Sequence, residues 1–211
     1  MNTLIDDIAF HLSRDLPGQD AQFQMASLNR YTRIPSTEGA TDAAVLLLLY
    51  PGHSGQTKMV FIERLSNNLK DHHRGQISFP GGRFEETDSD FSQTALREAE
   101  EEIGVSSATV ELLGPLTELF VPVSGYLIHP FVGFTTKTPS FVAQQTEVQS
   151  IIESDLDVIR DLDIRKSKDI RTPSNLLLKD VPYFDIHGRT VWGATAMILN
   201  EFLHLEPLRA G

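Results

Sequence analysis

The chain has 211 residues, no cysteine and a formal net charge of −11 at pH 7. The lack of cysteine excludes disulfides, thiolate nucleophiles and thiolate metal sites, so a bound metal would need oxygen or imidazole ligands. The acidic balance argues against sequence-independent binding of nucleic acid, because phosphate backbones are bound by clustered Lys and Arg. An anionic small molecule would need divalent cations, or a few focused Arg side chains and backbone N–H groups.

The first part of the chain predicts a short helical segment before any sheet. Apolar residues recur at helical spacing between Leu4 and Leu12, within an N-terminal helical extension that we place at residues 1–35. Residues 1–7 lack the basic start and the continuous apolar stretch of a secretion signal. The longest apolar run, Ala43–Tyr50, has eight residues, whereas a spanning helix needs about 20. We therefore expect a cytoplasmic protein without membrane contact.

The middle of the chain predicts a β-hairpin followed by a glycine turn. Strands are expected at Ala43–Tyr50 and Met59–Arg64, joined by a turn at Pro51–Gly55. A polar loop, Leu65–Gly75, then leads to Gln76-Ile77-Ser78-Phe79 and the breaker Pro80-Gly81-Gly82.

A helix is predicted from about Asp90 to Ile103, with Asp88 or Ser89 as its N-cap and Gly104 just past its end. After this helix, predicted strands and helices are interspersed but do not follow a strict βαβ order. Strands are expected at Val110–Leu113, Tyr126–Phe134, Tyr183–Asp185 and Thr190–Trp192, the last two joined at His187-Gly188, and helices at Ser154–Leu162 and Thr195–Leu203. This order predicts an α/β fold with a mixed sheet flanked by helices.

The helix at Asp90–Ile103 combines an apolar stripe with an acidic margin. On a wheel of about 100° per residue, Glu98, Glu101 and Glu102 share an arc that overlaps the edge of the stripe formed by Phe91, Ala95, Leu96, Ala99 and Ile103. A solvated acidic face is the simple alternative, since like-charge pairs on a helix surface cost only about 0.2–0.5 kcal/mol. The preceding Gly-Gly turn instead favours carboxylates that converge on Mg²⁺ beside a phosphate.

These residues resemble a known motif, the Nudix box, which reads G, five residues, E, seven residues, R-E-U-x-E-E-x-G-U. Its second half is matched throughout by Arg97-Glu98-Ala99, Glu101-Glu102 and Gly104-Val105. The first half departs from the motif, because Asp88 stands where Glu is usual and one extra residue separates it from Arg97. That departure puts a metal contact by Asp88 in doubt and leaves the three glutamates unaffected.

The resemblance implies the Nudix fold, an α/β/α sandwich around a mixed sheet, as a single domain over residues 1–211 with the box at residues 81–105. It also implies hydrolysis of a diphosphate with Mg²⁺ or Mn²⁺ held mainly by Glu98 and Glu102, with Glu101 sharing. Metal ions at such a site lower the pKa of bound water and neutralise charge on phosphoryl oxygens. Arg97 would orient the carboxylates by a salt bridge.

A second segment resembles the coenzyme A diphosphatase branch of that family. Its signature is matched by Arg64, Ser66 and Gly75–Gly82, and its box commonly shows the longer spacing. Leu65 and a lengthened loop depart from the signature. The resemblance implies coenzyme A or its acyl derivatives as substrate, and as substrate-binding residues Arg64, Lys70, His73, Arg74, Gln76, Ser78, Gly81 and Gly82. A basic loop suits the remote third phosphate, but Lys70 and Arg74 equally fit a solvated loop.

Other residues and functions stay open at this point. Glu147 resembles an acidic residue that some members use as ligand or base, and a surface role is the alternative; His73 also fits a solvated position. The alternatives in function are another Nudix substrate, such as ADP-ribose, a dinucleoside polyphosphate or an NTP, and a nucleotide sensor without catalysis. The complete acidic set argues against a sensor. A homodimer is a family-level expectation.

Overall fold

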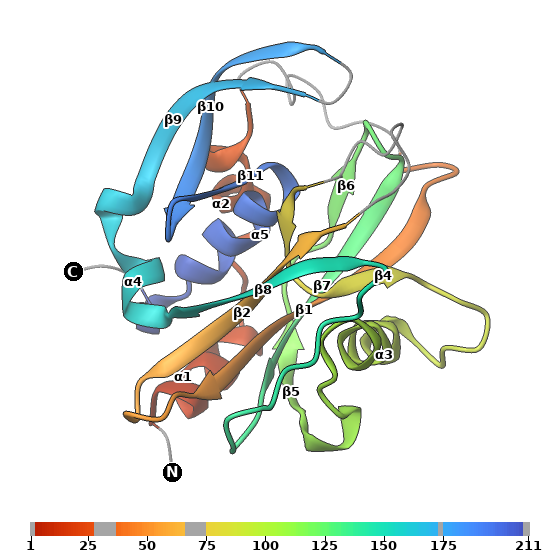
Figure 1. Cartoon of the computed structure of the whole chain (residues 1–211), viewed down its shortest axis with the longest axis vertical. Coiled ribbons are helices and arrows are strands. Elements are labelled where there is room, and N and C mark those ends of the chain that lie inside the picture. The colour runs from red at the N-terminus through yellow and green to blue at the C-terminus, as the bar shows by residue number, and fades with distance from the viewer. Residues whose placement is uncertain (1–2, 28–36, 66–74, 173–174, 209–211) are drawn as a thin grey trace.

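Two β-sheets and the helices around them make up the described part of the chain (Figure 1). The structure is a computed structural model, and it describes residues 3–27, 37–65, 75–172 and 175–208. The larger sheet has eight strands and the smaller sheet has three. The larger sheet is mixed and flanked by helices, as the sequence predicts.

The larger sheet is built around two parallel strands in its centre. β1 pairs in parallel with β7, and the other pairings described in this sheet are antiparallel. The expected hairpin of the first two strands is present. The strands are β1 (Thr41–Pro51), β2 (Thr57–Arg64), β3 (Ile77–Ser78), β4 (Gly81–Arg83), β5 (Glu111–Pro115), β6 (Leu119–Val121), β7 (Tyr126–Phe134) and β8 (Val148–Asp155).

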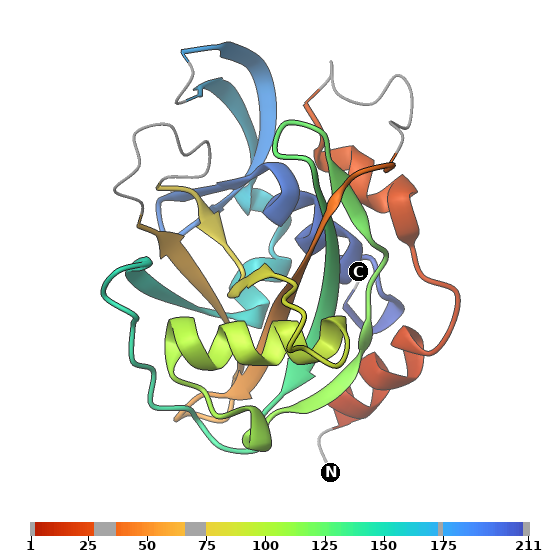
Figure 2. The ribbon, with the colours of Figure 1, turned by 90° about the vertical axis from the view of Figure 1, so that its right-hand side faces the viewer.

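Helices cover both faces of this sheet (Figure 2). The helices are α1 (Thr3–Leu12), α2 (Gly18–Gln22), α3 (Phe91–Ile103), α4 (Leu156–Arg160) and α5 (Gly193–Leu203). Helix α3 lies on one side, and α1, α2 and α5 lie on the other (Figure 1). Successive side chains of a strand point to opposite faces, so on β1 Leu47 and Leu49 pack toward α5 while Leu46 and Leu48 pack toward α3. Burial on both faces explains why Ala43–Tyr50 of β1 form an uninterrupted apolar run.

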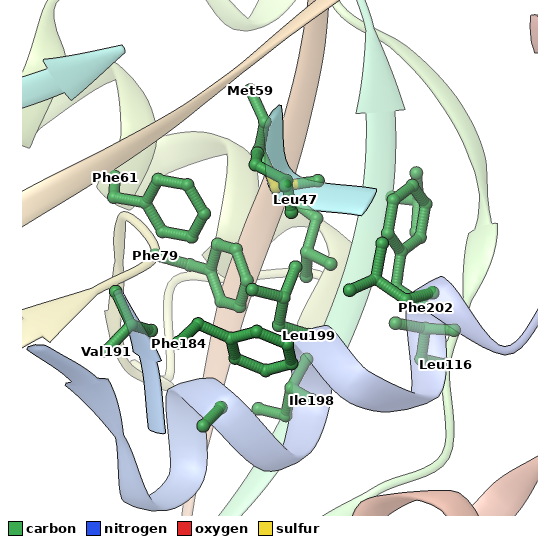
Figure 3. Close-up of a cluster of buried hydrophobic side chains, with 14 of the residues drawn as sticks. Leu47, Met59, Phe61, Phe79, Leu116, Phe184, Val191, Ile198, Leu199 and Phe202 are labelled. Atoms are coloured by element: carbon green, nitrogen blue, oxygen red, sulfur yellow. The ribbon is translucent and has the colours of Figure 1, made fainter. Parts of the chain in front are cut away.

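Aromatic and aliphatic side chains fill the layer between the larger sheet and α5 (Figure 3). Phe61 and Phe79 stack with ring centroids 5.1 Å apart, and Leu199 and Phe202 of α5 are fully buried beside them. This layer also receives Phe184 from the smaller sheet, so both sheets and α5 share one hydrophobic core.

The smaller sheet contains one more strand than the hairpin that the sequence predicts. Its strands are β9 (Arg165–Arg171), β10 (Leu177–Ile186) and β11 (Arg189–Trp192). The hairpin of β10 and β11 was expected, and it turns at His187 and Gly188, both with positive φ, which is the pattern of a tight type I′ turn. Strand β9 was not expected, because its mostly polar, exposed residues show no apolar alternation.

Two boundary predictions were wrong. The N-cap of α3 is Asp90, whose Oδ1 accepts a hydrogen bond from Gln93 N at 2.9 Å, so neither Asp88 nor Ser89 has that role. Ser154 and Asp155 end strand β8 and do not start a helix. Their pairing with Met59 and Lys58 of β2 extends the sheet and overrides the local helical pattern.

No helix in the described ranges is long and apolar enough to cross a membrane.

Candidate active site

The position of β4, which contains Gly81 and Gly82, is set by a change of partner along β1. Ala43–Val45 pair with β4, whereas Leu49–Pro51 pair with β2. Between these two stretches Leu46 N donates a hydrogen bond to Pro80 O at 2.9 Å. The chain from β3 to β4 is therefore held against the centre of the sheet, directly beside α3.

The sequence predicts a turn at Gly81 and Gly82, but these residues begin strand β4 because they pair with Val45 and Ala44 of β1. Both glycines make close contacts. A Cβ atom at Gly82 would overlap the carboxylate of Glu98, and one at Gly81 would overlap the backbone of Ala44 and Val45. At Gly81 the obstacle is backbone and φ is positive, so only glycine fits there. At Gly82 a side chain would instead displace the Glu98 carboxylate. The sequence motif Pro80-Gly81-Gly82 thus serves to place backbone atoms against the acidic side of α3.

The carboxylates of α3 differ in exposure. The side chain of Glu102 is 1% exposed, that of Glu98 13% and that of Glu101 58%. The helix is fixed at its two ends by the Asp90 cap and by Gly104, which adopts the left-handed conformation. Two of the three glutamates are therefore held at the edge of the core, and the solvated-face alternative does not describe them.

Glu102 is a buried carboxylate with incomplete compensation. Its Oε2 accepts a hydrogen bond from Gly81 N at 2.8 Å, and its Oε1 lies 3.4 Å from Nη1 of Arg64. Burial raises the pKa of Glu102 from an ordinary 4.5 to about 7, and repulsion from Glu98 and Glu147 adds to the rise against the opposing effects of Arg64 and Gly81. Burial likewise raises the pKa of Glu98, although Arg97 opposes it. The site is thus short of positive charge.

Arg97 is held by Asp88, a residue that sequence reasoning left out of the site. Arg97 Nε and Nη2 donate to the two oxygens of Asp88 at 2.9 and 3.0 Å, and Nη1 donates to Glu98 at 2.9 Å and lies 3.4 Å from Glu101. Asp88 also accepts from the Thr94 hydroxyl at 2.9 Å. The Arg97 hydrogen bonds hold the pKa of Asp88 well below its usual range. Asp88 therefore positions Arg97, and its oxygens are already engaged.

Replacing Asp88 by Asn should destabilise the protein by about 3 kcal/mol, because it breaks a largely buried ion pair and leaves Arg97 Nε and Nη2 without their carboxylate partner. Asp90→Ala is the matched control on the same loop, and it should cost only about 1 kcal/mol as a lost helix cap. Chemical denaturation of both variants measures the two free energies of unfolding. Equal losses would contradict the special place of Asp88.

The loop before β8 brings Glu147 to the same region. Gln144 N donates to Glu102 O at 3.0 Å, and Leu65 N donates to Glu147 O at 2.7 Å, which ties the loop to the end of α3 and to the end of β2. The Glu147 side chain is exposed, and its charge contributes to the raised pKa of Glu98 and Glu102. The structure therefore brings Glu147 together with the glutamates of α3.

Some of the residues expected to bind substrate lie at the edge of the larger sheet, and others lie outside the described residues. Ser78 lies opposite Ile62, and Arg64 lies two residues further along β2, so both side chains face the α3 side of the sheet. Among the described residues the buried Ser78 hydroxyl oxygen has no hydrogen-bond partner. Gln76 O accepts a hydrogen bond from Arg64 N at 3.0 Å. Lys70, His73 and Arg74 lie outside the described residues.

The donor set fits a hard divalent cation. Glu98, Glu101, Glu102 and Glu147 supply carboxylate oxygens, which Mg²⁺ and Mn²⁺ prefer. The raised pKa of Glu98 and Glu102 shows that added positive charge would stabilise their ionised forms. Within the described ranges no three His, Asp or Glu side chains are arranged as a complete metal centre. The carboxylates would therefore draw together when a cation binds.

Metal binding at this site should weaken as the pH falls through about 7, because below that pH a proton occupies Glu102 and competes with the cation. The affinity for Mn²⁺, measured by titration calorimetry, should drop roughly tenfold per pH unit in that range. Glu102→Gln should remove this dependence, and a flat wild-type profile would contradict the assignment.

The metal-free protein should lose stability as the pH rises over the same range. A carboxyl whose folded pKa is raised from 4.5 to about 7 lowers the free energy of unfolding as the pH rises between these values.

These features define an α/β/α domain in which an acidic helix packs against a short glycine-containing strand, β4. The profile of the NUDIX domain matches residues 40–157, which include all eight strands of the larger sheet and helix α3. The chain therefore belongs to the Nudix family.

Individual relatives agree with this placement. The chain is 32% identical over 145 residues to an uncharacterized Nudix hydrolase of Pectobacterium atrosepticum, NudL, an alignment that covers 69% of this chain and 73% of that protein. It is also 32% identical over 163 residues to Nudix hydrolase 15, mitochondrial, of Arabidopsis thaliana, with 74% of this chain covered. The chain spans only 55% of that Arabidopsis protein.

A solved structure agrees in fold. The MutT/nudix family protein from Enterococcus faecalis superimposes with a TM-score of 0.51 at 16% sequence identity, over 90% of this chain and 76% of that chain. At this identity the likeness concerns the fold alone.

Proposed function

We propose that this protein is a metal-dependent hydrolase of the pyrophosphate bond of coenzyme A and acyl-coenzyme A, forming 4′-phosphopantetheine and adenosine 3′,5′-bisphosphate. One observation supports this most directly. Arg64 and Gly81 stand at opposite ends of the segment that resembles the coenzyme A diphosphatase signature, and both contact Glu102 of the Nudix box. The segment that suggests the substrate therefore adjoins the carboxylates that suggest the chemistry.

Glu98 and Glu102 would hold Mg²⁺ or Mn²⁺ in this reaction, with Glu101 sharing. The bound cation supplies a water of lowered pKa and neutralises charge on the phosphoryl oxygens. Arg97, fixed by Asp88, keeps Glu98 in place against Gly82. The oxygen of water bonds to one phosphorus, and the bridging phosphorus–oxygen bond breaks, which releases a phosphate monoester on each side.

The proton of the attacking water goes to one of two exposed carboxylates, Glu101 or Glu147. Both lie beside the buried pair, Glu101 within reach of Arg97 and Glu147 near enough to raise the pKa of Glu98 and Glu102. The pH profiles of kcat for Glu101→Gln and Glu147→Gln show which of the two residues is the base. Loss of the base removes the fall of kcat at low pH.

The substrate is tested by mass spectrometry of products formed from coenzyme A with Mn²⁺, in parallel with a chelator. 4′-Phosphopantetheine and adenosine 3′,5′-bisphosphate are the expected products, and ¹⁸O-labelled water shows which of the two carries the new oxygen. A panel of ADP-ribose, a dinucleoside polyphosphate and an NTP is assayed alongside. Intact coenzyme A with rapid cleavage of another panel member would move the substrate assignment to that compound.

A further inference from the structure

Among the described residues two arginines, Arg64 and Arg97, contact the acidic site, and their hydrogen bonds differ in length. Arg97 makes hydrogen bonds of 2.9 to 3.1 Å to Asp88, Glu98 and the backbone of Arg83. The contacts of the Arg64 guanidinium with the described residues are two, both at 3.4 Å, to Glu102 Oε1 and to Gly81 O. Hydrogen bonds of that length are weak. Arg97 is therefore a fixed part of the site, whereas the described residues engage Arg64 only loosely.

We propose that Arg64 is an exchangeable counter-ion, which neutralises Glu102 in the metal-free site and is displaced by the divalent cation to bind a phosphate of the incoming substrate. This inference rests on the proposed function, because it assumes a metal at Glu102 and an anionic phosphate ligand. It goes beyond that function by assigning an order to the two binding events.

The geometry allows this exchange with little movement of the backbone. Arg64 N donates to Gln76 O, and Arg64 O accepts from Gly75 N at 2.9 Å, so the main chain is anchored at the end of β2. The side chain is 33% exposed, whereas its partner Glu102 is 1% exposed. The guanidinium can therefore turn toward solvent while the main chain of Arg64 stays in place.

Electrostatics gives the exchange its direction. A divalent cation on Glu102 compensates the carboxylate more fully than one loosely held guanidinium, and it repels that guanidinium. A planar guanidinium released beside a phosphate can bind two of its oxygens at once. Metal and anion should therefore bind with positive coupling, since each favours the same position of Arg64.

The test compares Mn²⁺ binding by titration calorimetry for the wild-type protein, Arg64→Gln and Arg64→Lys. Arg64→Gln removes the competing charge and should tighten Mn²⁺ binding roughly tenfold or more. Arg64→Lys keeps the charge and should bind Mn²⁺ like the wild type. Arg189→Gln is the matched control, because it removes the same positive charge beside another glutamate, Glu63. The side chain of Glu63 points to the other face of β2, away from the acidic site. Arg189→Gln should leave Mn²⁺ affinity unchanged.

The second readout is the binding of inorganic phosphate in the presence of Mg²⁺, followed by ³¹P NMR. Arg64→Gln should weaken phosphate binding while it tightens metal binding. This opposition of signs would not follow from a structural role, since disruption of the site would weaken both. Unchanged or weaker Mn²⁺ binding by Arg64→Gln would overturn the exchange. No Mn²⁺ binding by the wild-type protein would instead overturn the proposed metal-dependent function on which it rests.

Discussion

Replacing Glu98 by Gln is expected to lower kcat for the proposed hydrolysis by at least the roughly 10²–10⁴-fold scale of a lost acid–base or metal role. Gln has nearly the shape of Glu but cannot carry its negative charge, so it cannot compensate a divalent cation. The Glu98 carboxylate is mostly buried between Gly82 and Arg97, and the isosteric amide should leave the fold intact. Steady-state kinetics with Mn²⁺, together with thermal melting, separates the loss of chemistry from unfolding.

Glu100→Gln on the same helix is the control for this prediction. Glu100 is exposed and accepts a hydrogen bond from Ser107 N at 3.0 Å, outside the acidic cluster. Its substitution changes the helix charge by the same amount and should leave kcat close to that of the wild type. An unchanged rate for Glu98→Gln would show that this face of α3 takes no part in the reaction.

The second large effect is expected from a single methyl group. Gly82→Ala places a Cβ atom on the Glu98 carboxylate, which must then move from its position beside Arg97. A displacement of about 1 Å at a catalytic group can cost on the order of 10²-fold in rate. The kinetic assay above should therefore show a loss of that size for Gly82→Ala.

A double-mutant cycle shows whether the methyl group acts through Glu98. In a Glu98→Ala background the obstructing carboxylate is absent, so Gly82→Ala should add almost no further loss of kcat or of Mn²⁺ affinity. Such non-additivity is the mark of two residues that act on one another. Two additive losses would mean that Gly82 affects the reaction by another route.

The fold could be predicted in those segments where local pattern and final environment agree. Helix α3 is amphipathic and ends at a glycine, and β1 is apolar on both faces, so both were placed correctly from the sequence. Strands β8 and β9 were missed, because their residues show no clear alternation and become strands only by pairing with β2 and β10. Pairing partners supply hydrogen bonds that the sequence of one strand does not reveal.

The same distinction applies to the candidate site. The spacing of Glu98, Glu101 and Glu102 could be taken from the sequence, since one helix holds all three. The place of Asp88 could not, because it depends on the path of the loop that precedes Asp90. Glu147 lies far along the chain from α3, and only the backbone hydrogen bonds of its loop bring it beside Glu102.

The family and the acidic helix could be predicted from the sequence alone, because both depend on spacing within short segments. The contacts that restrict Gly81 and Gly82 come from β1 and α3 and needed the structure. The burial of each carboxylate, and the contact of Arg64 with Glu102, followed only from the tertiary structure. Glu102 is buried and Glu101 exposed although they are neighbours in the chain. That difference arises because Glu102 packs against Gly81 of β4 and Arg64 of β2, which lie far from α3 in the sequence.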